Sequence, residues 1–202
     1  SGQYKIALLE MAKKDIAAGA YSEAEEKLEK ALVYPENLGE GKLEGTKDNN
    51  LYYYLGLVKE ALGKEGAEEC FHLAELGDNE PAGAMYYYDQ PADMILYKGL
   101  AKQKLGKTKE AHACFNKLMD YGERHLNDVV KNDFFAVSLP DFLIFEDDMD
   151  KRNKSHCYYL MGLANLGMGQ KEKAVEEFDK ALEYDFNHQN CRIYKELAKG
   201  EL

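Results

Sequence analysis

The stretch YYLMGLANLGMGQKEKAVEEFDKAL, residues 158–182, predicts two amphipathic helices joined by a tight turn at Gly169. Its first half begins with an aromatic residue, Tyr158, and has a glycine four positions later, Gly162. Its second half carries a small residue, a large aromatic one and a second small one, namely Ala174, Phe178 and Ala181. Two helices cross closely only where one offers glycine or alanine and the partner fills the remaining space. The stretch therefore predicts a tightly packed helix pair.

This pattern resembles the tetratricopeptide repeat (TPR), in which an aromatic residue and a Leu-Gly pair precede a spaced Ala, Phe and Ala. Weaker copies of the second half occur earlier in the chain, at Ala24/Leu28/Ala31, Ala67/Phe71/Ala74 and Ala111/Phe115/Leu118. The resemblance implies an all-α fold, in which about four irregular helix pairs form a right-handed superhelix with inserts and a C-terminal capping helix.

We expect a single TPR-like helical domain over residues 1–202. Its repeats occupy about residues 5–34, 49–76, 92–125 and 155–184, with an insert at 126–150 and a capping helix at 187–199. The expected turns lie at Gly19, Gly63, Gly106 and Gly169, and the second is one residue shorter and hence tighter. Asp48 or Asn49 is expected to cap the following helix. In the insert, a short helix is expected near Pro140, capped by Ser138.

The charge of the chain argues against two classes of partner. The formal net charge is −11, whereas nucleic-acid binding and docking on anionic membranes both favour a basic surface. No apolar run approaches the roughly 18 residues that span a bilayer. The start, Ser1-Gly2, is typical of an excised fragment. We expect a cytoplasmic protein, with no nucleic-acid or membrane partner.

The four cysteines, Cys70, Cys114, Cys157 and Cys191, are scattered and show no Cys-x-x-Cys spacing. Buried free thiols are favoured over a disulfide framework.

The TPR resemblance also implies where a partner would bind. In that family the first helices of successive repeats line a concave groove that receives a peptide or another domain. The corresponding positions here are Tyr53, Leu57, Glu60, Asp93, Leu96, Leu100, Gln103, His156, Tyr159 and Leu163. The variant that grips a terminal carboxylate needs Lys and Asn at positions where the first repeat has Leu9 and Lys13, so we reject a carboxylate clamp. An apolar, aromatic groove suits a hydrophobic strip, although the chain's own inserts could cover part of it.

Two tyrosine runs raise a sugar-binding alternative. Successive helical residues point about 100° apart and form no single platform, so core packing with bonded hydroxyls is the interpretation for residues 52–54. Tyr86, Tyr87 and Tyr88 adjoin a loop and are the better candidates for contacts with a sugar or a partner.

Catalytic and metal-binding patterns are lacking in the sequence. The acidic run at 146–150 lacks the ligand spacing of a calcium loop and is interpreted as acids preceding a helix. His188 and Cys191 could share a metal, but no second ligand pair joins them. No nucleophile elbow, phosphate loop or His-Glu-x-x-His pattern occurs. We expect no catalytic residues, no metal and no cofactor.

The interruptions between repeats carry a second resemblance. Residues 34–39, 88–91 and 135–142 resemble the carboxyl-terminal TPR tail of a family of large bacterial proteins with an N-terminal β-rich region of unassigned function. The leading hypothesis is a non-catalytic scaffold that holds a protein or peptide, possible partners including the missing N-terminal domain of the same chain. Two alternatives stay open, namely a helical domain completing the site of a carbohydrate-active protein, and self-association through residues 134–145. The oligomeric state is not predicted.

Overall fold

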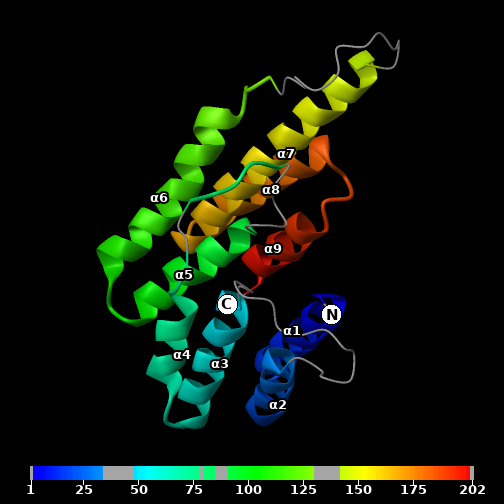
Figure 1. Cartoon of the computed structure of the whole chain (residues 1–202). Coiled ribbons are helices and arrows are strands. Elements are labelled where there is room, and N and C mark those ends of the chain that lie inside the picture. The colour runs from blue at the N-terminus through cyan, green and yellow to red at the C-terminus, as the bar shows by residue number, and fades with distance from the viewer. Residues whose placement is uncertain (1, 34–47, 78–79, 85–90, 130–141, 201–202) are drawn as a thin grey trace. The chain divides into compact units, whose positions relative to one another are not determined.

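The computed structural model describes residues 2–33, 48–77, 80–84, 91–129 and 142–200, without the side chains of 142–147. Within these ranges every regular element is a helix, which confirms the predicted all-α class (Figure 1). The helices are α1 (Gly2–Ala17), α2 (Tyr21–Leu32), α3 (Asn49–Leu62), α4 (Ala67–Ala74), α5 (Ala92–Lys104), α6 (Thr108–His125), α7 (Phe142–Gly167), α8 (Lys171–Tyr184) and α9 (Gln189–Lys199).

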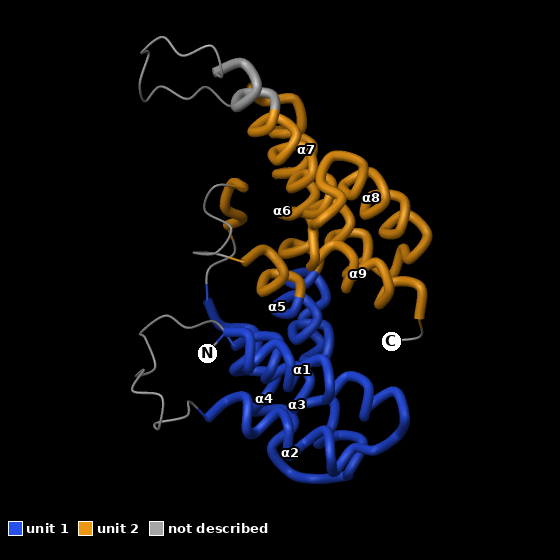
Figure 2. Tube along the Cα trace, turned by 90° about the vertical axis from the view of Figure 1, so that its right-hand side faces the viewer, with its two compact units in different colours: residues 1–78, 97–111 blue, residues 79–96, 112–202 orange. Residues whose placement is uncertain are grey.

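The chain divides into two compact units, coloured separately in Figure 2. Unit 1 comprises residues 1–78 and 97–111, and unit 2 comprises residues 79–96 and 112–202. In unit 1, α1 packs on α2, α2 on α3, and α3 on α4; in unit 2, α7 packs on α8 and α8 on α9. The division into compact units does not test the expectation of a single domain, which stays a prediction.

The four predicted turns share one backbone arrangement. At Gly19, Gly63, Gly106 and Gly169, the glycine N–H donates to the carbonyl three residues earlier, and the next N–H donates to the carbonyl five residues before it. This is the Schellman ending of a helix, which requires a positive φ at the glycine. The shorter second turn uses two such residues, Gly63 with φ 65° and Gly66 with φ 92°.

The helix pairs cross where the sequence places glycine opposite a ring. A methyl group on Gly56 of α3 would come within 2.6 Å of the Phe71 ring of α4, and one on Gly162 of α7 would overlap Phe178 of α8. The predicted close crossing is therefore confirmed at both pairs. The four cysteines are free and buried, as expected.

One expectation about a helix start is wrong, and another is confirmed only for the position of the capping residue. The acidic residues 146–150 lie inside α7, because that helix already begins at Phe142 and continues to Gly167. Residues 142–150 of the expected insert therefore belong to the first helix of the last pair, whereas Ser138 and Pro140 lie outside the described residues. At α3, Asp48 occupies the predicted cap position, but its side chain makes no capping bond, and its Oδ1 accepts from Lys5 Nζ at 2.8 Å.

Candidate functional site

The positions predicted to line a groove separate into two sets by exposure. In unit 1, Tyr53, Leu57 and Leu100 are half-buried, and Glu60 and Gln103 are exposed. We call these five residues the α3–α5 face. In unit 2 the remaining positions are all buried, namely Asp93, Leu96, His156, Tyr159 and Leu163.

The aromatic part of the α3–α5 face rests on a cluster of rings. Tyr53 lies 5.7 Å from the ring of Tyr97 and 6.1 Å from that of Phe71, measured between centroids. Behind it the hydroxyls of Tyr54 and Tyr97 lie 3.3 Å apart. Burial, and to a lesser degree the nearby Glu60 carboxylate, raises the pKa of Tyr53 to about 12. Tyr53 is therefore a neutral ring with a firm support, which is what an aromatic contact residue requires.

The apolar part of the face is anchored in the core of unit 1. Leu57 packs against the buried cluster formed by Phe71, Ala74 and Ala101 while remaining half-buried itself. Because the underlying atoms are fixed by core packing, Leu57 presents its outer surface without a large loss of side-chain entropy on binding.

The edge of the α3–α5 face is polar. Glu60 of α3 forms an ion pair with Lys104 of α5 at 2.6 Å, and the same ammonium lies 5.6 Å from the centre of the Phe71 ring. Lys104 was not among the positions predicted from the sequence. The sequence shows only that an acid, Glu60, and a base, Lys104, occur on the first helices of successive repeats. An ion pair between them can be predicted only once the two helices are known to be adjacent.

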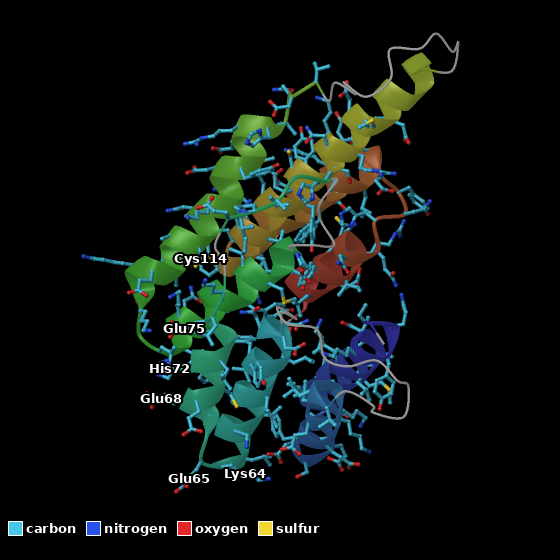
Figure 3. The ribbon with its side chains drawn as sticks, in the orientation of Figure 1. Lys64, Glu65, Glu68, His72, Glu75 and Cys114 are labelled. Atoms are coloured by element: carbon cyan, nitrogen blue, oxygen red, sulfur yellow. The ribbon has the colours of Figure 1, made fainter. Side chains whose placement is uncertain are left out.

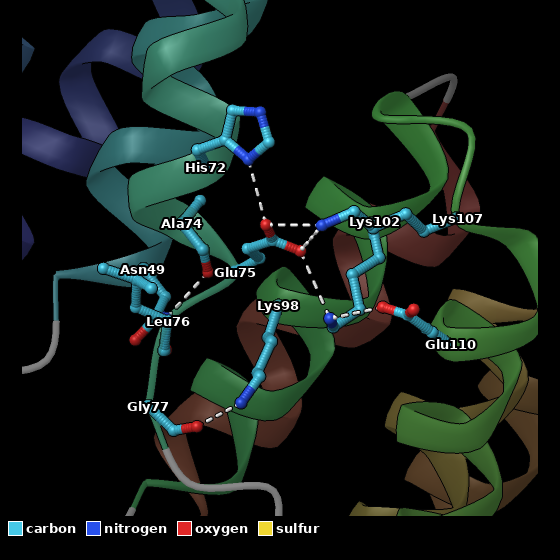
Figure 4. A network of polar contacts seen from close by, with 10 residues as sticks. All are labelled: Asn49, His72, Ala74, Glu75, Leu76, Gly77, Lys98, Lys102, Lys107 and Glu110. Carbon is cyan, nitrogen blue, oxygen red and sulfur yellow. Dashed lines mark hydrogen bonds and ion pairs between the residues drawn. The ribbon is translucent and has the colours of Figure 1, made fainter.

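A partly exposed ion network lies at the junction of α4, α5 and α6 in unit 1 (Figure 4). The Glu75 carboxylate accepts from Lys107 Nζ at 2.8 and 2.9 Å, from Lys102 Nζ at 3.2 Å, and lies 3.0 Å from His72 Nδ1. Burial raises the pKa of Glu75, but the bonds from Lys107, His72 and Lys102 outweigh it and hold the pKa at about 2. Figure 3 shows Glu68 and His72 on α4 and Glu75 at the end of that helix. The network fixes the helix that carries Leu100 and Gln103.

Three of the buried positions of unit 2, namely Asp93, His156 and Tyr159, contact other segments of the same unit. His156 Nε2 donates to the Ala82 carbonyl at 2.8 Å. The Tyr194 hydroxyl of α9 donates to Asp93 Oδ2 at 2.8 Å. Tyr159 lies 4.6 Å from the His188 ring and 6.2 Å from the Tyr194 ring. These three predicted groove positions thus contact residues 80–84, His188 and α9.

Burial also sets the protonation of this region. Desolvation lowers the pKa of His156 to about 4, against a smaller opposing effect of its bond to the Ala82 carbonyl. Desolvation likewise lowers the pKa of His188. Both imidazoles are therefore neutral near pH 7, which removes the cost of burying a cation.

The predicted capping helix covers the last pair with Cys191, Tyr194 and Ala198, all buried. Its reach to Asp93 was not predicted, because a contact between residues 101 positions apart has no local signature. His188 serves as the cap of α9, its Nδ1 accepting from the Cys191 backbone N–H at 3.1 Å.

Four further expectations concern other parts of the chain. Tyr86, Tyr87 and Tyr88, on which the sugar-binding alternative depends, lie outside the described residues, as does most of the segment proposed for self-association. In the described part, no group of three or more His, Cys, Asp or Glu side chains is placed to hold a metal ion. None of the described helices combines the length and the hydropathy needed to cross a membrane.

Comparison with known proteins gives no family and a weak structural similarity. No protein-family model matches the sequence. A solved structure of a thermophilic TPR protein from Thermus thermophilus aligns with a TM-score of 0.31 and 17% sequence identity, over 96% of this chain and 98% of that chain.

Proposed function

We propose that this chain is a non-catalytic scaffold that holds a polypeptide segment on the α3–α5 face of unit 1. The observation that carries the proposal is the half-buried state of Tyr53, Leu57 and Leu100. These apolar side chains are supported from behind by the core yet keep part of their surface in contact with solvent. In the repeat family that the sequence resembles, the same positions receive a peptide or another domain.

The chemistry of the face suggests the kind of segment it takes. Aromatic and aliphatic side chains at the centre favour an apolar strip, because burial of such residues supplies most of the affinity of a peptide interface. The chain carries a net charge of −11, so lysine or arginine on either side of the strip would speed association. We therefore propose as partner a short apolar segment flanked by basic residues, from another protein or from elsewhere in the same polypeptide.

A phage-displayed random-peptide library, selected against the full chain, tests this proposal. We expect enrichment of apolar peptides with basic flanks. Their affinity should fall at least about tenfold in Leu57→Asp and in Leu100→Asp, because each places a charge in the apolar centre of the face.

The matched control is Leu73→Asp on α4, at a leucine that is 44% exposed and lies outside the α3–α5 face. Circular dichroism verifies that all three variants keep their helical content. The proposal is wrong if no peptide is enriched, or if Leu73→Asp weakens the selected peptides as much as the other two variants. Binding to a glycan array by the chain, in place of peptides, would favour the carbohydrate alternative.

A further inference from the structure

In unit 2, α9 lies on positions that the TPR resemblance assigned to partner binding. Tyr194 reaches the carboxylate of Asp93 on α5, and the rings of Tyr194 and His188 both lie against Tyr159 on α7. Tyr159 is completely buried in consequence of this packing and of its contact with Phe178. An amphipathic helix therefore already occupies the face.

The contacts of α9 have the character of a recognition interface. One aromatic side chain, Tyr194, fills the centre and ends in a hydroxyl that donates to a buried carboxylate at 2.8 Å. Two small side chains, Cys191 and Ala198, flank it on the same side of the helix and are also buried. A central tyrosine with a bonded hydroxyl and small flanking residues is a common way for a groove to select a helix.

Few buried side chains keep α9 in place. The helix has 11 residues, of which Cys191, Tyr194 and Ala198 are buried. Helices of this length are marginal without tertiary contacts, and elements with few buried side chains open at a lower free energy than the core does. The release of α9 would uncover Asp93 and Tyr159 while α7 and α8 remain packed on each other.

We propose that the face of unit 2 formed by Asp93 and Tyr159 is a helix-docking surface, and that α9 is its intramolecular occupant. A helix presenting a tyrosine between small residues, as α9 does, fits the same surface when α9 is released. This inference adds a second binding surface to the proposed scaffold. The release and docking of α9 do not depend on the proposed function, whereas the biological role of the surface rests on it.

Cysteine labelling of the full chain with a maleimide, resolved by mass spectrometry, tests the release. The Cys191 thiol donates to the Phe178 carbonyl and is fully buried, so labelling requires the helix to open. We expect Cys191 to react before Cys114 and Cys157, which are buried on α6 and α7. Tyr194→Phe, which loses the bond to Asp93, should raise the Cys191 rate about tenfold or more and leave the other two rates unchanged.

Tyr184→Phe is the matched control, since Tyr184 on α8 is 38% exposed and the same hydroxyl is removed. It should not alter the Cys191 rate. If Cys191 reacts only together with Cys114 and Cys157, α9 opens only when unit 2 unfolds, and the proposal is wrong.

Docking is tested with a synthetic peptide of residues 187–200 carrying Cys191→Ser. Added at millimolar concentration to the Tyr194→Phe chain, it should raise the Cys191 labelling rate severalfold by occupying the vacated face, since tethered α9 competes at a millimolar effective concentration. The same peptide with Tyr194→Ala should have no effect. An unchanged rate with the first peptide would overturn the docking proposal. The labelled cysteine, Cys191, lies in unit 2, whereas the selected peptides are proposed to bind at Leu57 in unit 1. Failure of either experiment therefore leaves the other proposal standing.

Discussion

Gly56 of α3 and Phe71 of α4 lie so close that a methyl group on the glycine would come within 2.6 Å of the ring. The ring is 2% exposed and belongs to the core cluster of unit 1. This contact sets the distance between the two helices, because the phenyl group occupies the volume that any side chain at position 56 would need.

Gly56→Ala should therefore destabilise unit 1. Overpacking of a core typically costs about 1–3 kcal/mol, and the better helix propensity of alanine offsets up to about 1 kcal/mol of that. We expect a net loss of about 1–2 kcal/mol in the free energy of unfolding, measured by urea titration. Gly2→Ala, where nothing lies within 4 Å, is the control and should be neutral. An unchanged free energy of unfolding in Gly56→Ala would contradict this prediction, because it would mean that α3 and α4 can move apart without loss of stability.

The side chain of Asn49 joins the start of α3 to the end of α4. Its Nδ2 donates to the Ala74 and Leu76 carbonyls, both at 2.7 Å, and the residue is buried. Asn49→Ala should cost about 1–3 kcal/mol, because the buried Ala74 carbonyl and the partly buried Leu76 carbonyl both lose this donor. The neighbouring Asn50→Ala serves as the control, since Asn50 is half-buried and bonds only locally, to the Leu51 backbone N–H. Equal losses in the two variants would contradict this role for Asn49.

The Glu75 network should contribute to the stability of unit 1. Glu75→Gln leaves Lys102 and Lys107 beside a neutral amide, so we expect a loss of about 1–2 kcal/mol in a urea titration at pH 7. Glu68→Gln, at a side chain that is 82% exposed, should change stability by less than about 0.5 kcal/mol. Because the pKa of Glu75 is about 2, its contribution is present above about pH 4.5 and declines below it. If Glu75→Gln loses as much stability at pH 2 as at pH 7, the ionised Glu75 carboxylate is not the source of the stabilisation.

The buried imidazole of His156 makes unit 2 sensitive to mild acid. Its pKa is about 4 in the folded state against about 6.5 in the unfolded chain. Stability is therefore fully present above pH 6.5 and declines as the pH falls toward 4, by about 2 kcal/mol between pH 7 and pH 5. Among the described residues, the Ala82 carbonyl, the Tyr121 ring and His188 face His156, and His188 titrates in the same direction.

His156→Gln should flatten this dependence, because the amide can still donate to the Ala82 carbonyl but does not titrate. The measurement is the free energy of unfolding of the full chain at pH 7 and at pH 5. His112→Gln, at an exposed histidine on α6, should retain the acid loss of the unmodified chain. The same acid loss in all three proteins would show that His156 is not its source.

Predictions based on local spacing agreed with the structure where the cause is local. Glycines at the turns end helices by backbone geometry alone, and the small residues at 24, 31, 174 and 181 are buried because helical periodicity places them on the inner side. The start of α7 was misplaced, since an acidic run can precede a helix or lie within one, and both satisfy local preferences. The candidate site was predicted only in part, because exposure depends on what lies on top of a residue.

The sequence by itself determined the helical class, the turns and the small-to-large contacts within each pair, because helix periodicity and steric fit act between residues close in the chain. The tertiary structure alone decided which first-helix positions stay accessible. Leu57 is half-buried and Tyr159 is completely buried, although both occupy predicted groove positions. The difference arises from α9, whose Tyr194 bonds to Asp93 across 101 residues, a separation at which no pattern of neighbouring residues specifies contact.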